Sequence, residues 1–250
     1  MEHTHRNRVT AVTGGTSGIG RGIVEKLLAH SEEGDRIFVN YAHNEQRAQA
    51  FIESLPPKHR EKILLVKADM SSYEAMLSFV KEIKARTGYV DWLVCNAGIS
   101  TYARYEDYTF EEWTKIVNTN LSVPVFLVKE LRPIMNEGGR ILFMGSYAGR
   151  QAYSSSLVYG VTKAAIHFLT KSLVKEFEPK GITVNAIAPG FIQTPWHENR
   201  SRESYDRINK KIALHRFGEI GDVADLAYCI LTNGYMNGSI VDIHGGYDYF

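Results

Sequence analysis

The chain has 250 residues, of which 23% are charged and 44% hydrophobic, and its formal net charge is +1. These values are ordinary for a globular protein, and the length suits one α/β domain with a large core. The nearly neutral charge gives no reason to expect a nucleic acid or an anionic membrane as partner, and no apolar run reaches the length of a membrane span.

The N-terminus and the cysteines indicate the compartment. The first six residues contain no apolar segment of the kind found in secretory signals. Cys95 and Cys229 both lie in apolar stretches, the usual place for buried free thiols, so we expect no disulfide and a cytoplasmic location. His3 and His5 have no partner ligands at suitable spacing, so we expect a solvated tail and no metal site.

Short β-rich runs alternate with longer amphipathic stretches along the whole chain. We expect seven strands, at residues 8–12, 36–41, 63–67, 92–95, 140–145, 183–188 and 240–243. We expect helices at residues 18–30, 45–55, 73–87, 110–135, 157–178 and 223–231. Nearly continuous apolar strands separated by helices are typical of a doubly wound, mostly parallel sheet with helices on both faces. No repeat or linker interrupts the series, so residues 1–250 are predicted to form a single domain.

One long stretch, residues 190–218, has no clear periodicity. It is polar but carries Trp196, Tyr205 and Phe217. Long loops in compact domains are often functional, so this stretch is interpreted as a lid over a substrate, with a mobile surface loop as the alternative.

A glycine cluster follows the first expected strand and opens the first helix. Residues 13–20 read Thr-Gly-Gly-Thr-Ser-Gly-Ile-Gly. Gly14, Gly18 and Gly20 would let the backbone turn tightly and approach a pyrophosphate, whose charge a helix N-terminus stabilises. Such a cluster can also be only a tight turn, but the strand before it and the helix after it favour a dinucleotide site.

The end of the second strand bears on which dinucleotide binds. Dinucleotide folds often place a carboxylate there to bind the adenosine ribose. Residues 39–44 contain none, because Asp35 falls before the strand. His43 or Arg47 could instead pair with a 2′-phosphate, which favours NADP(H) over NAD(H). The alternative is that His43 is an ordinary exposed loop residue.

A tyrosine and a lysine four residues apart suggest acid–base chemistry. Tyr159 and Lys163 would share one face of a helix. A phenol has a reference pKa of about 10, and a nearby ammonium lowers that value. The pair could therefore exchange a proton with an alcohol or carbonyl oxygen, which Ser146 could polarise. By itself the spacing is also typical of a helix with one buried ring and one solvated amine.

Taken together, the motifs resemble those of the classical short-chain dehydrogenase/reductase family, the group that includes 3-oxoacyl-carrier-protein reductases. The matching pieces are residues 13–20, Asp69, Asn96-Ala97-Gly98, Asn120, Gly145-Ser146, Tyr159 with Lys163, Asn185 and residues 189–194. They occur in the family's order over nearly the whole length. The resemblance implies a Rossmann-like fold and hydride transfer between a nicotinamide cofactor and a small-molecule ketone or secondary alcohol.

The resemblance also assigns catalytic roles. Ser146 would orient the substrate oxygen, and Tyr159 would supply or remove its proton. Lys163 would bind the nicotinamide ribose and lower the pKa of Tyr159, while Asn120 would hold a water that links Lys163 to solvent. The alternative role of Asn120 is that of a helical residue at an interface. Asn185, inside a strand, is expected to be structural.

A larger set would bind the cofactor. It comprises Gly14, Thr16, Ser17, Gly18, Ile19, Gly20, Tyr41, His43, Asp69, Met70, Asn96, Ala97, Gly98, Tyr159, Lys163, Pro189, Gly190, Ile192 and Thr194. Within this set, Asp69 would accept a hydrogen bond from the adenine amine, with a helix cap as its alternative role. Ile192 and Thr194 would hold the nicotinamide carboxamide.

The substrate is less constrained. The loop after Gly98, residues 147–156 and the predicted lid would line its pocket. Their aromatic residues, Tyr102, Tyr105, Tyr153 and Trp196, would suit a ring or a mid-sized polar carbonyl compound. Glu137, just before the fifth strand, would repel an acidic carrier protein, although Lys175 and Lys180 could attract one, so a carrier-bound substrate stays an alternative.

The sequence also bears on two alternative functions and on the oligomeric state. A non-catalytic dinucleotide-binding regulator is disfavoured by the intact Ser146, Tyr159 and Lys163. An epimerase or dehydratase acting on nucleotide sugars is disfavoured by the length, which leaves little room for a second domain. By resemblance, helices 110–135 and 157–178 would pair across a two-fold axis to give a homotetramer or a dimer.

Overall fold

The computed structural model describes residues 7–101, 103–152 and 156–247. Seven strands form one sheet in the order β3-β2-β1-β4-β5-β6-β7, and every neighbouring pair is parallel. The strands are β1 (Val9–Val12), β2 (Arg36–Tyr41), β3 (Ile63–Lys67), β4 (Val90–Cys95), β5 (Met135–Met144), β6 (Thr183–Pro189) and β7 (Ile240–Ile243). This order confirms the doubly wound Rossmann-like sheet, whose topological switch point lies between β1 and β4.

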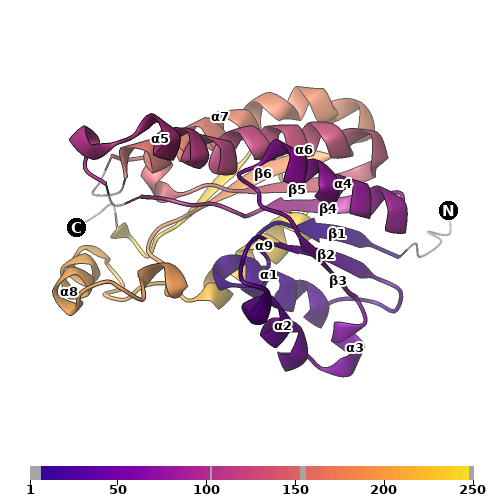
Figure 1. The fold of residues 1–250 in the computed structure, drawn as a ribbon, viewed down its shortest axis with the longest axis horizontal. Coiled ribbons are helices and arrows are strands. Elements are labelled where there is room, and N and C mark those ends of the chain that lie inside the picture. Colours follow the sequence, from indigo (N-terminus) through magenta and orange to yellow (C-terminus); the bar gives the residue numbers. More distant parts are fainter. Residues whose placement is uncertain (1–6, 102, 153–155, 248–250) are drawn as a thin grey trace.

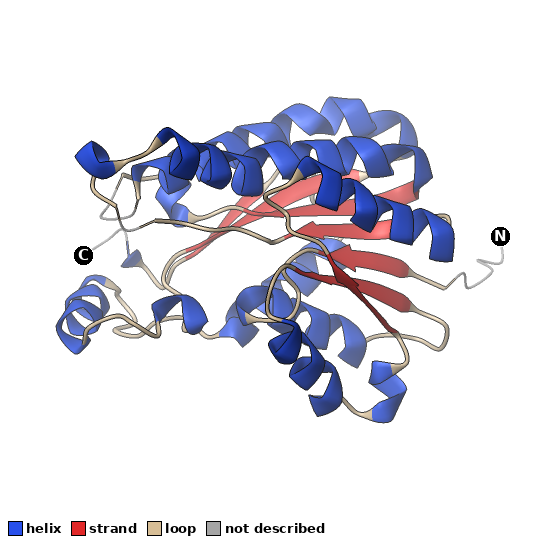
Figure 2. Cartoon of the chain, viewed as in Figure 1, coloured by secondary structure: helices blue, strands red, loops and turns tan. Residues whose placement is uncertain are grey.

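Helices cover both faces of the sheet (Figures 1 and 2). On one face lie α1 (Gly18–Ala29), α2 (Glu45–Ser54) and α9 (Ile220–Thr232), with the short α3 (Pro57–Arg60) near β3. On the other lie α4 (Tyr73–Arg86), α5 (Phe110–Val117), α6 (Val123–Leu131) and α7 (Leu157–Phe177). The carboxyl ends of all the strands therefore open at one edge, between the two helical layers.

The two layers have separate hydrophobic cores because successive strand residues point to opposite faces. Ala11 and Leu93 pair in the β1–β4 ladder and pack into the core beneath α4, α6 and α7. Their neighbours Val12 and Val94 also pair, and pack with α1 and α9. The apolar runs in the sequence thus reflect burial on both sides of a parallel sheet.

The helix expected at residues 110–135 is interrupted. After α5, residues Asn118–Ser122 form a π-turn, α6 follows, a 3₁₀ turn spans Arg132–Ile134, and β5 already begins at Met135. Pro124 has no N–H to donate to the carbonyl of Asn120, and the ladder shifts so that the Val123 N–H donates to the Asn118 carbonyl. The single-helix expectation was therefore wrong in detail.

Residues 190–218 contain a helix that periodicity did not reveal. α8 (Arg202–Lys211) begins after Ser201, whose side chain accepts a hydrogen bond from the Ser204 N–H. Only Ile208 of α8 is buried, and it packs with Ile212 and Phe217 in a small separate cluster. A helix with a single buried residue gives almost no apolar pattern in the sequence.

The cysteines differ from one another. Cys95 is buried at the end of β4, and burial raises the pKa of its thiol to about 12. Cys229 is exposed on α9, so the expectation that both thiols are buried was wrong. Within the described residues, no helix combines the length and apolar composition that a membrane span requires.

Candidate active site

A cleft of about 1200 Å³ opens at the carboxyl ends of the strands, where dinucleotides bind in folds of this kind. It extends from His43 and Asp69, after β2 and β3, to Trp196, after β6. Of the residues predicted from the sequence, those that line it are Gly14, Ser17, Gly18, Ile19, His43, Asp69, Met70, Asn96, Ala97, Gly98, Ser146, Tyr159, Lys163, Pro189, Gly190, Ile192 and Thr194. Segments far apart in the sequence are therefore brought into one site.

The glycine loop between β1 and α1 is built for close approach of a ligand. Gly14 and Gly18 have φ angles of +61° and +52°, in the left-handed region that favours glycine. A side chain at Gly20 would collide with the Gly14 carbonyl and with the Asn96 amide. That amide donates to the carbonyls of Thr13 and Gly14 at 3.0 and 3.1 Å, which fixes the loop against the end of β4.

The start of α1 leaves donors for an anion. Ser17 precedes the helix but makes no side-chain hydrogen bond that caps it. The N–H groups of a first helical turn have no partners within the helix and carry the positive end of its dipole. Ser17, Gly18 and Ile19 line the cleft at this point. The glycine cradle and the uncapped helix together fit the pyrophosphate of a dinucleotide.

Four predicted residues do not line the cleft. Tyr41 is buried, because Asn40 and Ala42 take the cleft-facing positions around it. Thr16 lines an adjoining groove with Arg47. The other two, Gly20 and Asn120, lie behind residues that line the cleft: Gly20 packs against Gly14 and Asn96, and Asn120 is hydrogen-bonded to Ile99. Asn40 lines the cleft without having been predicted, although an asparagine in an apolar strand is a signal of such a role. Its side-chain amide accepts from the Gly14 N–H at 3.2 Å and donates to the Ala68 carbonyl at 2.8 Å.

Asp69 is a turn residue that lines the cleft, whereas the helix cap that the sequence also suggested is Ser72, at the start of α4. One carboxylate oxygen accepts from the Ser71 N–H at 2.9 Å, which makes it a turn residue, and the other lies 3.2 Å from Nε2 of His43. Partial burial acts to raise the pKa of Asp69, but the hydrogen bonds from Ser71 and the charges of His43 and Lys115 hold it below its usual value. A charged carboxylate therefore faces the far end of the cleft.

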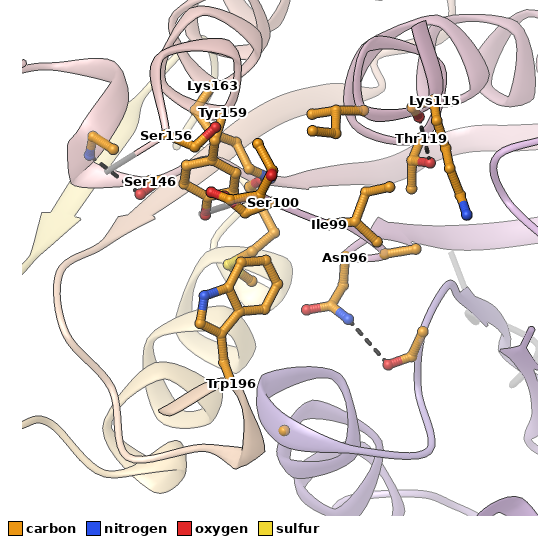
Figure 3. Close-up of a pocket in the computed structure, with 18 of the residues that line it drawn as sticks. Asn96, Ile99, Ser100, Lys115, Thr119, Ser146, Ser156, Tyr159, Lys163 and Trp196 are labelled. Carbon is orange, nitrogen blue, oxygen red and sulfur yellow. Dashed lines mark hydrogen bonds between the residues drawn. The ribbon is translucent and has the colours of Figure 1, made fainter. Parts of the chain in front are cut away.

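Tyr159, Lys163 and Ser146 meet at the other end (Figure 3). Tyr159 and Lys163 project from successive turns of α7, and Ser146 lies just after β5. The hydroxyl of Ser146 accepts from the Ala148 N–H at 3.2 Å, and its side chain lies next to that of Tyr159. The buried Lys163 Nζ donates to the Met144 carbonyl at 2.7 Å.

The expectation that Lys163 lowers the pKa of Tyr159 was wrong for this structure. Burial raises the pKa of Tyr159 above its usual value, and the neighbouring Ser146 hydroxyl only offsets part of that rise. Burial also lowers the pKa of Lys163, to about 8. The ammonium lies 5.5 Å from the centroid of the phenol ring. Without a bound cofactor, Tyr159 is therefore a protonated acid at neutral pH.

Asn120 shapes the wall behind Lys163. Its side-chain oxygen accepts from the Ile99 N–H at 2.9 Å, and its amide donates to the Ile99 carbonyl and the Thr162 hydroxyl at 2.9 and 3.1 Å. Both amide hydrogens are thereby committed. A side chain at Gly98 would lie only 3.3 Å from the Asn120 oxygen and 3.5 Å from Lys163 Nζ. The predicted water would therefore have to bind the main-chain carbonyl of Asn120, to which Pro124 has no N–H to donate. Such π-turns often occur at functional sites.

The segment after β6 closes one side of the cleft. Ile192 pairs with Gly218 in an isolated bridge, and the Gln193 N–H donates to the Gly218 carbonyl at 2.8 Å. Trp196 approaches Tyr159 with 5.8 Å between ring centroids. Tyr205 and Phe217 instead stack on each other within the segment and do not line the cleft.

Several lining residues were missed or lie beyond what can be described. Tyr105, expected from the sequence, lines the cleft, whereas Tyr102 and Tyr153 fall outside the described residues. Tyr108, which was not singled out from the sequence, is hydrogen-bonded to Ser156, the last residue of the segment 147–156 that was expected to line the pocket, at 3.0 Å. Asn185 is structural as expected: it is buried in β6 and donates to the Met236 carbonyl at 2.7 Å. Among the described residues, no group of His, Cys, Asp or Glu is arranged to hold a metal ion.

A doubly wound sheet with a dinucleotide cradle at its switch point, and a serine, tyrosine and lysine in the same cleft, defines a nicotinamide-dependent oxidoreductase. A family profile described as enoyl-(acyl carrier protein) reductase matches residues 14–248. The chain belongs to the short-chain dehydrogenase/reductase family, as the sequence motifs predicted.

Relatives span the whole chain. A 3-oxoacyl-(acyl-carrier-protein) reductase of Staphylococcus epidermidis is 32% identical over 244 residues, covering 96% of this chain and 98% of that protein. An acetoacetyl-CoA reductase of Rhizobium meliloti is 35% identical over 249 residues, covering 98% and 99%. A short-chain dehydrogenase/reductase from Serratia marcescens superposes with a TM-score of 0.88 at 28% identity, covering 98% of this chain and 99% of that chain. A metagenomic blue fluorescent protein solved with NADPH also gives 0.88 at 28% identity, covering 96% and 97%.

Proposed function

We propose that this protein transfers a hydride between a nicotinamide cofactor and a ketone or secondary alcohol, with Tyr159 as the acid and base. The observation that carries the proposal is that Ser146, Tyr159 and Lys163 meet in the cleft, with Lys163 one helical turn after Tyr159 and its ammonium 5.5 Å from the centroid of the phenol ring. The bound cofactor would supply or accept the hydride. Residues 1–250 would act as one catalytic domain, with residues 190–218 as its substrate lid.

The three side chains have complementary roles in a reduction. The Ser146 oxygen accepts from the Ala148 N–H, and its O–H would turn to the substrate carbonyl and orient it. Tyr159 is protonated at neutral pH and donates its proton to that oxygen as charge develops on it. Lys163, held at the Met144 carbonyl, would bind ribose hydroxyls and stabilise the phenolate that remains. In the oxidative direction the same phenolate removes the alcohol proton.

The cofactor would lie along the cleft from Asp69 to Tyr159. The pyrophosphate fits the glycine cradle and the start of α1, and Asp69 offers its carboxylate to the adenine amine. Thr194 lies beside the glycine loop, since a side chain at Gly18 would approach it to 3.8 Å. Ile192 and Thr194 are therefore placed to contact the nicotinamide carboxamide.

Within the cofactor class, we favour NADP(H) over NAD(H). The end of β2 offers Asn40, Ala42 and His43 to the cleft, with no carboxylate to repel a 2′-phosphate. His43 is already engaged with Asp69 at 3.2 Å. Arg47, at the start of α2, lines the groove beside Ser17 and is the better candidate for that phosphate. Solved relatives from a metagenomic library and from Burkholderia cenocepacia hold NADPH and NADP.

The relatives' names make a 3-oxoacyl thioester a specific candidate substrate. The argument that Glu137 repels an acidic carrier was wrong, because Glu137 lies near the amino end of β5 and the cleft opens at the carboxyl ends. Lys180, which donates to the Met135 carbonyl, lies at that same amino end. Neither residue therefore bears on a partner at the cleft.

We also infer a homotetramer or dimer working in the cytoplasm. Phe110 on α5 and Phe168 on α7 are 85% and 75% exposed, and Leu157 and Val161 are exposed on α7 as well. Apolar groups gathered on neighbouring helices are typical of a surface that another subunit covers. Sedimentation equilibrium should give a dimer or tetramer at micromolar concentration, and Phe168→Glu should weaken it; a monomeric wild type contradicts the inference.

Tyr159→Phe tests the proposed chemistry. The variant should lose nearly all reduction of ketones, because the ring remains and the acidic O–H is gone. Binding of NADPH, followed by fluorescence titration, should change little. Tyr235→Phe, at a ring that is 98% exposed, serves as the matched control and should retain full turnover. A Tyr159→Phe variant with wild-type turnover would refute the role of this residue. A wild type that binds NADPH but turns over no carbonyl or alcohol would favour a dinucleotide-binding regulator.

A further inference from the structure

Arg200 lines the cleft and makes no ion pair with the described residues. Its neighbour Arg202, by contrast, lies 3.9 Å from the carboxylate of Asp206. The guanidinium of Arg200 donates instead to the Ser204 hydroxyl at 2.9 Å and approaches Nδ1 of His197 at 3.4 Å. Both partners are uncharged, because burial and the charge of Arg200 lower the pKa of His197 to about 4.

The charge of Arg200 is partly removed from water without being neutralised. Its guanidinium lies over the ring of Phe191, 5.6 Å from the centroid, and its Nε is buried with no hydrogen-bond partner among the described residues. Asp69, Glu111 and Glu112 are the carboxylates that line the cleft, and none of them lies within 4 Å of the guanidinium. A half-buried cation without a counter-ion is costly, so an anion entering this space would be stabilised.

Arg200 faces the substrate side of the segment that follows β6. Trp196, His197 and Arg200 all line the main cleft, whereas Glu198 lines the separate groove beside the glycine loop. Trp196 is the residue next to Tyr159, and Arg200 follows it by about one turn. The guanidinium therefore lines the same cleft as Tyr159, with Trp196 and His197 between the two positions along the wall.

We propose that Arg200 is a specificity-determining residue that binds a carboxylate on the carbonyl substrate, so that the preferred substrates are oxo acids. This inference rests on the proposed function and names its substrate class. Arginine presents a planar set of donors that matches a carboxylate. The guanidinium of Arg200 stacks over the Phe191 ring and contacts His197 and Ser204, and these contacts hold its plane in place. The carbonyl would then reach Ser146 and Tyr159 while the carboxylate stays under the lid.

The test compares substrates that differ only in charge. Wild type, Arg200→Gln, Arg200→Lys and the control Arg202→Gln would be assayed with a series of 2-oxo and 3-oxo acids and with their methyl esters. Arg202 is 95% exposed on its side chain and lies outside the cleft, so its variant should match wild type. Arg200→Gln should lower kcat/KM for the acids by about tenfold to a hundredfold, mostly through KM, and leave the esters nearly unchanged.

The remaining arms separate the sources of the anion and the causes of failure. Arg200→Lys, which keeps a point charge, should recover part of the loss. Equal losses of kcat/KM for acids and esters would overturn the proposal. A loss confined to the KM for NADPH would also overturn it, because Arg200 would then bind a cofactor phosphate. A wild type that prefers the esters would also overturn it while leaving the carbonyl reductase function intact. A wild type that reduces neither acids nor esters but reduces other ketones would likewise overturn only this inference, whereas one that turns over no ketone or secondary alcohol would overturn both.

Discussion

Lys163 lies one turn after Tyr159 on α7, with its ammonium 5.5 Å from the centroid of the phenol ring and 2.7 Å from the carbonyl oxygen of Met144. The lysine is almost completely buried, and its one hydrogen bond in this structure goes to an uncharged carbonyl. The protein therefore holds a positive charge beside the Tyr159 phenol, and the burial of this charge lowers its stability. Such an arrangement is expected where function and stability conflict.

This conflict predicts a pH-dependent effect of Lys163→Met. Burial lowers the pKa of Lys163 from 10.5 to about 8, so between these values the unfolded chain binds more protons than the folded one, and stability rises with pH. At pH 7 the buried, charged lysine destabilises the fold, and replacing it removes this penalty. The free energy of unfolding should therefore rise by roughly 3 kcal/mol at pH 7, and this gain should shrink toward pH 10. Urea unfolding at both pH values checks this; a gain that does not depend on pH contradicts it. Turnover should be lost at either pH.

Gly20→Ala should damage the cofactor cradle. The new methyl group would collide with the Gly14 carbonyl and the Asn96 amide, so the loop must shift. We expect a loss of about 1–3 kcal/mol in stability and weaker binding of NADPH. Gly221→Ala is the matched control, because Gly221 is also a helical glycine and nothing lies within 4 Å of the position of its added methyl group. Thermal melts with and without NADPH measure both effects, and identical behaviour of the two variants would count against the cradle.

Arg47→Ala should change the choice of cofactor. If Arg47 meets the 2′-phosphate, the variant should lose about tenfold or more in affinity for NADPH, as expected for a charge-assisted contact, and keep its affinity for NADH. His43→Ala should have a smaller effect, because His43 is engaged with Asp69. Fluorescence titration with both cofactors gives the ratio. Tighter binding of NADH than NADPH by the wild type would refute the proposed preference.

Asn120→Ala should loosen the wall behind Lys163. The substitution leaves the N–H and carbonyl of Ile99 without their partners, at a cost of about 1–3 kcal/mol in stability. Thr162→Val removes only one of the three bonds to the Asn120 side chain and should cost less. Turnover of Asn120→Ala should fall further than its NADPH affinity, because Gly98 and Lys163 lose a fixed neighbour. An Asn120→Ala variant as stable and active as the wild type would contradict this reading of the wall.

The sequence was sufficient for the seven strands and for most of the residues that the fold brings together in the cleft. Seven apolar runs became seven strands, because burial on both faces of a parallel sheet requires such runs whatever their neighbours. The glycine loop, Ser146, Tyr159 and Lys163 could be predicted for a similar reason: turn geometry and side-chain chemistry are properties of local sequence. α8 could not, since its single buried residue left no pattern to detect.

Only the tertiary structure decided the environments of these residues. The direction of the pKa shift of Tyr159 depends on burial by segments distant in the chain, and spacing along one helix carries no information about it. The same is true of Glu137, whose distance from the cleft depends on which end of β5 it occupies, and of Arg200, whose uncharged partners are brought together by the fold of residues 191–204. Local sequence thus determines which groups are present and in what order, whereas the free energy of each charge is determined by the water and dipoles that the folded chain leaves around it.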